Sequence, residues 1–401
     1  MKKFGFSMKL SIGLGVVAFV IAVVGLVWIS TRVPAEDPIQ VRQSNGLPRI
    51  QAAADIDATV FAVLERNGMP SASIAVVDGD GIRYMRAFGT QEGSPRDLAN
   101  EATVFRAASL SKPVFAYLVM LLVADGRIDL DTPLQEYLPK PLSEYPDYAD
   151  LAGDERTGKL TARLALTHQG GFPNWRWQQP DRRLRFLFSP GERFSYSGEG
   201  YGCLQFVLEQ LTGKDFEDLS RERIFVPLGM RHTSWVWQDG FDSNLAFDRR
   251  PIDEFFGPGF LERANAAGSL LTTASDYARF LGAVLAGIGL SLDLCDEMLR
   301  PQIAISSEAL FGPPAEVKPV AEVAGLPTWA LGWGGFAAGE IPARFHIGYE
   351  EQFENYTVLY PSLNLGLVVL TSGGQRLQAV SPELVRAVLG ETADPFEWMG
   401  Y

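Results

Sequence analysis

The sequence predicts an α+β domain preceded by one membrane-spanning helix. Strand-like runs lie near both ends of residues 50–401, and helical patterns dominate from about residue 104 to about residue 300. This order favours an antiparallel sheet built from the two chain ends, flanked by helices and joined to a mostly helical subdomain. A long uncharged apolar run near the start of the chain predicts the membrane helix.

The apolar run extends from Leu10 to Ser30, which is 21 residues without a charge. As a helix it would span roughly 30 Å, the hydrocarbon thickness of a bilayer. Lysines precede the run and acidic residues follow it, so we expect residues 1–9 in the cytoplasm and the domain in the periplasm, outside the plasma (inner) membrane. A cleavable signal peptide ending near Ala35 is the alternative, but the length of the run favours an uncleaved anchor.

Residues 31–49 carry three prolines and no sustained periodicity, which is typical of a linker. The next segment predicts a helix, with one apolar face formed by Ile56, Val60, Val63 and Leu64. Two strand-like runs, "SASIAVV" and "IRYMRAFG", flank the turn "DGDG" and predict a hairpin. Near the other end, "FHIG", "NYTVLY" and "LGLVVLTS" predict strands, and "SPELVRAVLG" predicts a closing helix.

Composition excludes several classes of function. The formal net charge of −13 argues against a nucleic-acid partner, which requires a basic surface. The two cysteines, Cys203 and Cys295, have no metal-ligand spacing and are typical of small core residues. Phosphate-loop, HExxH and G-x-S-x-G motifs are absent from the sequence. No metal or organic cofactor is implied, and the sequence leaves the oligomeric state open.

The stretch "RAASLSKPVFAYLVMLLVADG" places Ser109 three residues before Lys112, at the start of an apolar helix. Residues three apart share a helix face, so the amine can reach the hydroxyl. Burial of the helix would lower the pKa of the lysine and let it accept a proton, while unpaired backbone N–H groups could stabilise an oxyanion. Such a pair also arises by chance in a chain of this length, but this is the only Ser-x-x-Lys in the sequence.

Five longer stretches occur in an order typical of one known family. They are "FRAASLSKPVFAYLVMLLVADGRIDLDTPLQEYLP", "LALTHQGGFP", "SPGERFSYSGEGYGCLQFVLEQLTG", "AAGSLLTTASDYARFLGAVL" and "WALGWGGF". Together they resemble the serine β-lactamase and penicillin-binding-protein superfamily, in the branch of class C β-lactamases, D-Ala-D-Ala carboxypeptidases and family VIII esterases. The resemblance covers about residues 50–390 and implies a β-lactamase-like fold.

The resemblance implies catalytic roles for three residues of the first two motifs. Ser109 matches the acylated nucleophile, Lys112 its general base, and Tyr196 in "YSG" the tyrosine that passes the proton to the leaving group. We expect a phenol beside an ammonium group to lose its proton more readily than a free one. A buried aromatic residue after a turn is the alternative for Tyr196. At a substrate-binding position the motif's asparagine is replaced by Gly198, which removes one hydrogen-bonding side chain.

The third motif, Lys-Thr-Gly in β-lactamases, aligns with His346, Ile347 and Gly348. The resemblance implies a catalytic His346 and a Gly348 that lets the backbone approach the substrate closely. It also implies that the backbone N–H of Tyr349 binds the substrate oxyanion, together with the N–H of Ser109. Ile347 lacks the hydroxyl that could bind a substrate carboxylate.

Further residues near the implied cleft have two interpretations each. Trp175 lies in the region that lines the family's cleft, which implies substrate binding. The arginines of that region either receive a substrate carboxylate or form a solvated basic loop; they are Arg176, Arg182, Arg183 and Arg185. Glu350 and Glu351 either attract a substrate ammonium group or face water. His168 and His232 resemble structural histidines and are assigned no chemistry.

These expectations describe a membrane-anchored serine hydrolase that acts outside the cytoplasm through an acyl-enzyme. D-amino-acid peptides, small esters or amides, and β-lactams all fit the resemblance. The altered second and third motifs favour peptidase or esterase activity over efficient β-lactam hydrolysis. The competing class is a binder of penicillin or cell-wall peptides with little turnover, which the missing asparagine favours.

Overall fold

The computed structural model describes residues 46–90, 98–241, 244–246, 262–305, 310, 327–350, 353–373 and 380–399. These residues all belong to one unit, residues 40–401. The expected membrane helix at residues 10–30 and most of the linker at residues 31–49 lie outside the described residues. Within the described ranges, no helix is long and apolar enough to cross a bilayer.

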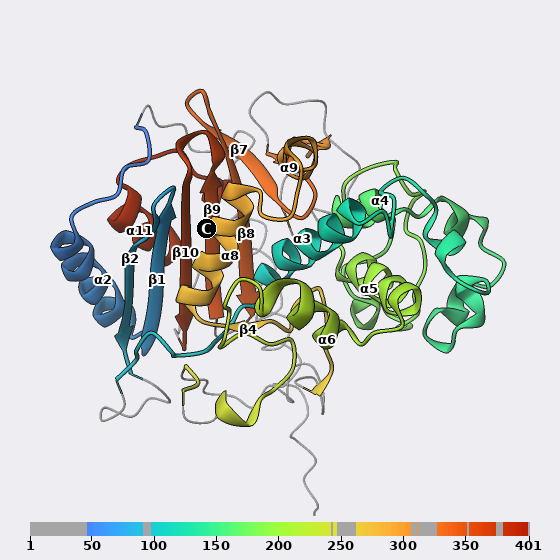
Figure 1. The fold of residues 1–401 in the computed structure, drawn as a ribbon, viewed down its shortest axis with the longest axis horizontal. Helices are drawn as coiled ribbons and strands as arrows, with labels where there is room; N and C mark the ends of the chain where they lie inside the picture. The colour runs from blue at the N-terminus through green and yellow to red at the C-terminus, as the bar shows by residue number, and fades with distance from the viewer. Residues whose placement is uncertain are drawn as a thin grey trace, which may run out of the picture. The chain divides into compact units, whose positions relative to one another are not determined.

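A large antiparallel sheet forms the centre of the unit (Figure 1). In the described residues it has eight strands in the order β2-β1-β10-β9-β8-β7-β6-β5. The strands are β1 Ser71–Asp78, β2 Gly81–Gly89, β5 Ile303–Ala304, β6 Thr328–Trp329, β7 Gly334–Ala338, β8 Ile341–Glu350, β9 Phe353–Tyr360 and β10 Leu365–Ser372. The predicted hairpin is confirmed as β1–β2, and the three predicted C-terminal strands as β8, β9 and β10.

The first and last long strands pair directly with each other. Ser71 of β1 lies opposite Ser372 of β10, and the antiparallel register continues to Val77 and Gly366. Both strands are buried along nearly their whole length, which explains their continuous apolar sequences. The expectation of a sheet built from both chain ends is therefore confirmed.

Helices cover both faces of this sheet. On one face, Ala75 and Val77 pack in the same apolar cluster as Leu281 of α8, Ala274–Ala286, which Figure 1 shows in front of the strands and running alongside them. On the other face, Ile74 and Val76 join the cluster that contains the terminal helices. These helices are α2 Ala53–Asn67, α11 Val380–Leu389 and α12 Phe396–Met399. This alternation along β1 follows from the period of two of a strand.

The predicted apolar face of the first helix is confirmed. In α2 the buried residues are Ile56, Val60, Val63 and Leu64, as the spacing predicted. The helix ends where Gly68 adopts a left-handed conformation with φ of +60°, and its N–H closes the last turn.

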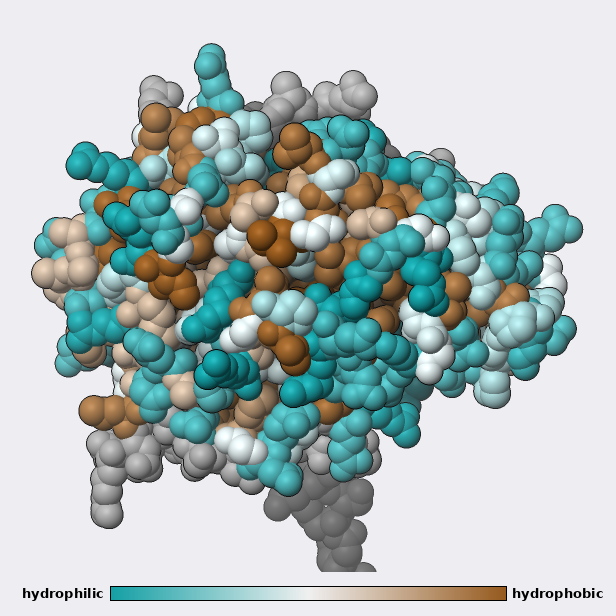
Figure 2. Space-filling model, viewed as in Figure 1, coloured by the Kyte–Doolittle hydropathy of each residue, from teal (hydrophilic) through white to brown (hydrophobic). Residues whose placement is uncertain are grey.

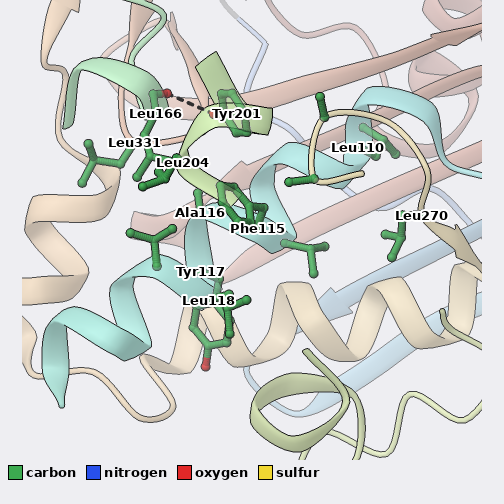
Figure 3. Packing of buried hydrophobic residues seen from close by; sticks show 14 of the residues in the cluster. Leu110, Phe115, Ala116, Tyr117, Leu118, Leu166, Tyr201, Leu204, Leu270 and Leu331 are labelled. Atoms are coloured by element: carbon green, nitrogen blue, oxygen red, sulfur yellow. Dashed lines mark hydrogen bonds between the residues drawn. The ribbon is translucent and has the colours of Figure 1, made fainter. Parts of the chain in front are cut away.

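The helical region lies beside the sheet and is centred on α3, Ser111–Ala124. Its other helices are α4 Ala162–Leu166, α5 Gly198–Thr212, α6 Phe216–Ser220 and α9 Leu292–Leu299. Residues on every side of α3 are buried, and Figure 3 shows Phe115 and Ala116 beside Tyr201 of α5. Such burial is expected for a helix that is apolar all round.

The two cysteines are both free thiols. Cys203 is a buried core residue on α5, as expected, whereas Cys295 on α9 is only partly buried. On the face shown in Figure 2, hydrophilic and apolar residues are interspersed, which is normal for a folded domain.

Candidate active site

Ser109 lies in a tight 3-10 turn, Ala108–Leu110, that leads directly into α3. Hydrogen bonds from the segment before α8 hold this turn: the Ala107 N–H donates to the Leu270 carbonyl at 2.8 Å, and the Leu270 N–H donates to Ser111 Oγ at 3.0 Å. Ala108 has a φ of +48°, an unusual conformation for a residue with a Cβ. The position of the hydroxyl of Ser109 is therefore fixed by contacts outside its own helix.

Lys112 is fully buried directly beside Ser109. Its Nζ lies 3.0 Å from Ser109 Oγ and donates to the Ala267 carbonyl at 2.7 Å. Among the described residues no carboxylate forms an ion pair with it. Burial lowers the pKa of Lys112 well below its usual value, because the charged amine has lost its water. The expectation of a desolvated amine within reach of Ser109 is confirmed.

Aromatic rings enclose this amine. Nζ lies 4.6 Å from the ring centroid of Tyr196 and 5.5 Å from that of Tyr201, whose hydroxyl donates to the Leu166 carbonyl at 3.0 Å (Figure 3). Burial raises the pKa of Tyr196, and a hydrogen bond with Ser109 lowers it by less. The expectation of a readily ionised phenol is wrong, because an uncharged Lys112 cannot offset the burial of a phenolate.

His346 lies on β8 and faces Tyr196, with the two ring centroids 6.2 Å apart. Its Nδ1 lies 2.7 Å from the Ile347 carbonyl. A carbonyl only accepts, so Nδ1 carries the proton and Nε2 keeps a lone pair. Burial, with a smaller contribution from Lys112, lowers the pKa of His346 to about 3. The structure thus adds a neutral histidine to the cluster of Ser109, Lys112 and Tyr196.

His168 also belongs to this cluster, which the sequence did not indicate. Its ring centroid lies 4.2 Å from that of Tyr196, and its Nδ1 accepts from the Ser197 N–H at 3.0 Å. Burial lowers its pKa well below the usual value, with further contributions from Lys112 and His346. The interpretation of His168 as structural missed this proximity to Tyr196, because nothing in the "LTHQGG" stretch indicates what lies beside it.

Gly348 and Tyr349 lie where β8 passes the turn that carries Ser109. A Cβ on Gly348 would lie 2.2 Å from the Ala107 carbonyl oxygen, so only glycine permits this approach. Gly348 therefore contacts the turn that carries Ser109. Tyr349, the next residue, has 48% of its side chain exposed, so its ring lies at the surface beside the site.

Gly198 is the first residue of α5 and contacts Trp175. A Cβ on Gly198 would lie 2.5 Å from Cη2 of the indole and 2.7 Å from Cζ2 and Cζ3. Trp175 in turn stacks on Trp177, with ring centroids 4.4 Å apart. The structure therefore brings Trp175 into direct contact with the replaced motif position, Gly198, which is two residues after Tyr196.

The charged residues around the site pair with one another. Glu350 is buried and forms an ion pair with Arg106, so it neither faces water nor offers a free carboxylate; Glu351 lies outside the described residues. Three of the four arginines near Trp175 also have carboxylate partners, in the pairs Arg176–Glu199, Arg183–Asp150 and Arg185–Asp181. These three pairs favour a structural role over capture of a substrate carboxylate.

Among the described residues, no group of three or more His, Cys, Asp or Glu side chains is arranged to hold a metal ion. The expectation that no cofactor is needed stays a prediction. His232 is exposed, unlike the buried cluster. Its backbone N–H donates to the side chain of Asp276 in α8 at 2.7 Å.

Comparison with known proteins supports the sequence resemblance. A model of the Beta-lactamase family matches residues 56–389. The chain is 28% identical over 367 residues to penicillin-binding protein 4 of Amycolatopsis lactamdurans, which covers 83% of this chain and 88% of that protein. It is 27% identical over 342 residues to esterase EstB of Burkholderia gladioli, which covers 71% and 85%.

Solved structures show the same fold at lower identity. A penicillin-binding protein homologue from Pyrococcus abyssi matches with a TM-score of 0.66 at 19% identity, over 84% of this chain and 76% of that chain. A class C beta-lactamase matches with a TM-score of 0.64 at 18% identity, over 84% and 96%. The expected β-lactamase-like α+β fold is confirmed.

Proposed function

We propose, since this chain belongs to the Beta-lactamase family of serine hydrolases, that it cleaves ester or amide bonds through an acyl-enzyme formed on Ser109. One observation carries the proposal: a buried amine without a carboxylate partner among the described residues lies 3.0 Å from the hydroxyl of Ser109. An uncharged amine in this place accepts the proton that the serine must lose.

The first step forms an acyl-enzyme. Oγ of Ser109 attacks the substrate carbonyl carbon, and its proton passes to the lone pair of Lys112. The carbonyl oxygen becomes an oxyanion, which accepts hydrogen bonds from the backbone N–H groups of Ser109 and Tyr349. Gly348 supports this role because it holds Tyr349 beside the nucleophile turn.

Collapse of the tetrahedral intermediate breaks the bond to the leaving group. Tyr196 passes a proton from the Lys112 ammonium to the leaving oxygen or nitrogen, and it stays a neutral phenol before and after this transfer because burial disfavours the phenolate. Water then attacks the acyl-enzyme in the same geometry and frees Ser109. His346 supplies a neutral hydrogen-bond acceptor, Nε2, next to Tyr196.

We propose D-amino-acid peptides and small esters as the substrate class, ahead of β-lactams. Gly198 and Ile347 remove two polar side chains that β-lactamases use in their motifs, and an esterase is among the relatives. The second candidate is a penicillin- or peptide-binding protein with slow turnover, which the replacement at Gly198 favours.

We also propose that residues 10–30 anchor the protein in the plasma membrane, with the hydrolase domain on the periplasmic side. The charge-free length of the segment and the lysines before it support this orientation. Sequencing the N-terminus of the mature protein tests it: a mature chain that begins near Glu36 would overturn the anchor.

Covalent labelling tests the proposed nucleophile. The full-length protein is treated in detergent with a fluorescent fluorophosphonate and a fluorescent penicillin, beside Ser109→Ala and the control Ser362→Ala, an exposed serine between β9 and β10. We expect labelling of the wild type and the control, none of Ser109→Ala, and turnover of a nitrophenyl ester or a D-Ala-D-Ala peptide. Stable labelling without turnover supports the binding protein, and equal labelling of Ser109→Ala would refute the nucleophile.

A further inference from the structure

In this chain the indole of Trp175 occupies the space at Gly198, where the second motif normally has a polar side chain. The benzene edge of the Trp175 indole lies where a side chain on Gly198 would begin, with Cη2 2.5 Å from the ideal Cβ. Real Cβ atoms do not approach other atoms so closely, so indole and side chain exclude each other. The backbone of Gly198 is not the reason for glycine, since its φ is outside the left-handed region.

Hydrogen bonds fasten the segment that carries Trp175 to the start of α5. Ser197 Oγ donates to the Pro173 carbonyl at 2.8 Å, and the Gly198 N–H donates to the carbonyl and the side-chain oxygen of Asn174, both at 3.0 Å. The Glu199 N–H also donates to the Asn174 carbonyl. The indole is therefore held over Gly198 by the same residues that cap the helix.

An ion pair fixes the next residue of this segment. The guanidinium of Arg176 binds both oxygens of Glu199, which is 8% exposed, and Glu199 Oε1 also accepts from the Arg176 backbone N–H at 2.7 Å. Nη1 of Arg176 donates to the Asp147 carbonyl at 2.6 Å. A bidentate pair in a half-buried setting orients the backbone on either side of it, which includes Trp175 and Trp177.

The two tryptophans form a continuous aromatic surface. Their ring planes are 16° apart, and Trp177 has 44% of its side chain exposed. The stack thus runs from the contact with Gly198, next to the catalytic tyrosine, out to solvent. A surface of this kind contacts flat apolar groups through dispersion and ring stacking, and it offers few hydrogen-bonding groups to a carbonyl or amide.

We propose that Trp175 and Trp177 determine specificity by replacing the motif's amide with an aromatic surface that binds an aromatic group of the substrate. This inference rests on the proposed function, because it assumes that Ser109 is the nucleophile. The expected substrates are esters or amides with an aromatic ring near the scissile carbonyl.

The first test compares rates for substrates with and without a ring. kcat/KM is measured for ethyl acetate, ethyl phenylacetate (ring on the acyl side) and benzyl acetate (ring on the alcohol side). We expect one aromatic ester to be preferred over ethyl acetate, and Trp177→Ala to reduce that preference by roughly threefold to tenfold, the range of one aromatic pair. The side of the ring that is preferred identifies which part of the substrate meets the stack.

A matched control and a labelling readout separate the two proposals. Phe61→Ala removes a half-exposed ring from α2 and should keep the wild-type preference. All variants are labelled with the fluorophosphonate to verify Ser109. A wild type that labels but shows no aromatic preference, or a preference that Trp177→Ala leaves intact, overturns the inference alone. A wild type in which Ser109 does not label overturns the proposed function and the inference with it.

The second test uses the mutual exclusion of the indole and a side chain at position 198. Gly198→Ala should lower kcat/KM for ethyl acetate as well as for the preferred ester, because the new methyl group displaces the indole. Trp175→Ala combined with Gly198→Ala should restore part of the rate with ethyl acetate but not the aromatic preference. Trp175→Phe keeps a ring and should fold even if Trp175→Ala does not. Additive effects of the two alanine substitutions would overturn the inference.

Discussion

Two buried basic residues, Arg106 and Lys112, lie six residues apart on either side of Ser109, and their surroundings differ. Arg106, 8% exposed, pairs with the carboxylate of Glu350 and lies over the ring of Phe353 at 5.0 Å. Lys112, 0% exposed, contacts a hydroxyl, a carbonyl and aromatic rings. A carboxylate offsets the buried guanidinium of Arg106, whereas burial without a carboxylate partner among the described residues favours the neutral amine of Lys112. Similar burial thus gives a structural ion pair in one place and an uncharged amine in the other.

Removing the proton-accepting ability of Lys112 should have the largest effect. Lys112→Arg keeps a cation that cannot be deprotonated, so we expect kcat/KM to fall by about 10²- to 10⁴-fold, the contribution of a general base. Steady-state kinetics with a nitrophenyl ester measure this. Lys140→Arg, at an exposed lysine, is the control and should retain the wild-type rate. If the two variants hydrolyse at similar rates, Lys112 is not the base.

Removing the carboxylate of Glu350 should break its buried ion pair with Arg106. Because a buried pair that loses one charged member is strongly destabilising, we expect Glu350→Gln to lower the free energy of unfolding by about 3–5 kcal/mol in urea denaturation. Arg66→Ala breaks an exposed pair with Glu383 and should cost less than about 1 kcal/mol. Equal losses in the two variants would show that burial does not distinguish these pairs.

The two histidines near Lys112, His168 and His346, should make the stability of the protein depend on pH in the acid range. The folded pKa of His346, about 3, lies below its unfolded value of 6.5, and that of His168 is also lowered. At a pH between the folded and the unfolded pKa of each histidine, the unfolded chain therefore binds more protons than the folded protein. The free energy of unfolding then falls as the pH drops below 6.5, by about 1.4 kcal/mol per pH unit for each histidine.

Urea denaturation from pH 7 to pH 4.5 measures this slope. Glu354, whose pKa burial raises to about 8, contributes with the opposite sign from pH 4.5 to 8, so wild type and variants must be compared at each pH. His168→Gln with His346→Gln should flatten the slope, whereas His232→Gln, at an exposed histidine, should not. A slope that the double variant retains would contradict the neutral state of these histidines.

The smallest expected effect concerns the aromatic enclosure of Lys112. Tyr201→Phe keeps the ring 5.5 Å from Nζ and removes only the hydroxyl that donates to the Leu166 carbonyl. We expect a loss of about 1 kcal/mol in the free energy of unfolding and an unchanged pH–rate profile. In both proteins the rate should rise with pH through the lowered pKa of Lys112. A shift of this profile in Tyr201→Phe would show that the hydroxyl of Tyr201, and not its ring, affects the pKa of Lys112.

The parts that could be predicted depend on neighbours in sequence. Ser109 and Lys112 are three apart, so helix geometry alone places them together. The apolar face of α2 and the β1–β2 hairpin follow from local periodicity in the same way. The sheet from both chain ends could be predicted as well, because long apolar strands need partners and helical patterns dominate the sequence between them.

The remaining parts of the site depend on contacts between distant segments. Neither "NWRW" nor "YSGEG" indicates that Trp175 fills the space next to Gly198, since only folding brings them together. The pairing of Glu350 with Arg106 likewise joins distant segments. The ionisation of Tyr196 was predicted wrongly because burial, which raises the pKa of its phenol, depends on the same kind of contact. Composition and spacing carry no information about such burial.

The pairing of β1 with β10 has a consequence for how the protein is made. Residues 71–78 can pair with β2 early, but their other edge stays without its partner until residues 365–372 have been synthesised. Contacts so distant along the chain slow folding. A nascent chain that already carries Ser109 and Lys112 therefore still lacks the framework that holds them, and hydrolytic activity should arise only once residues 365–372 have been synthesised.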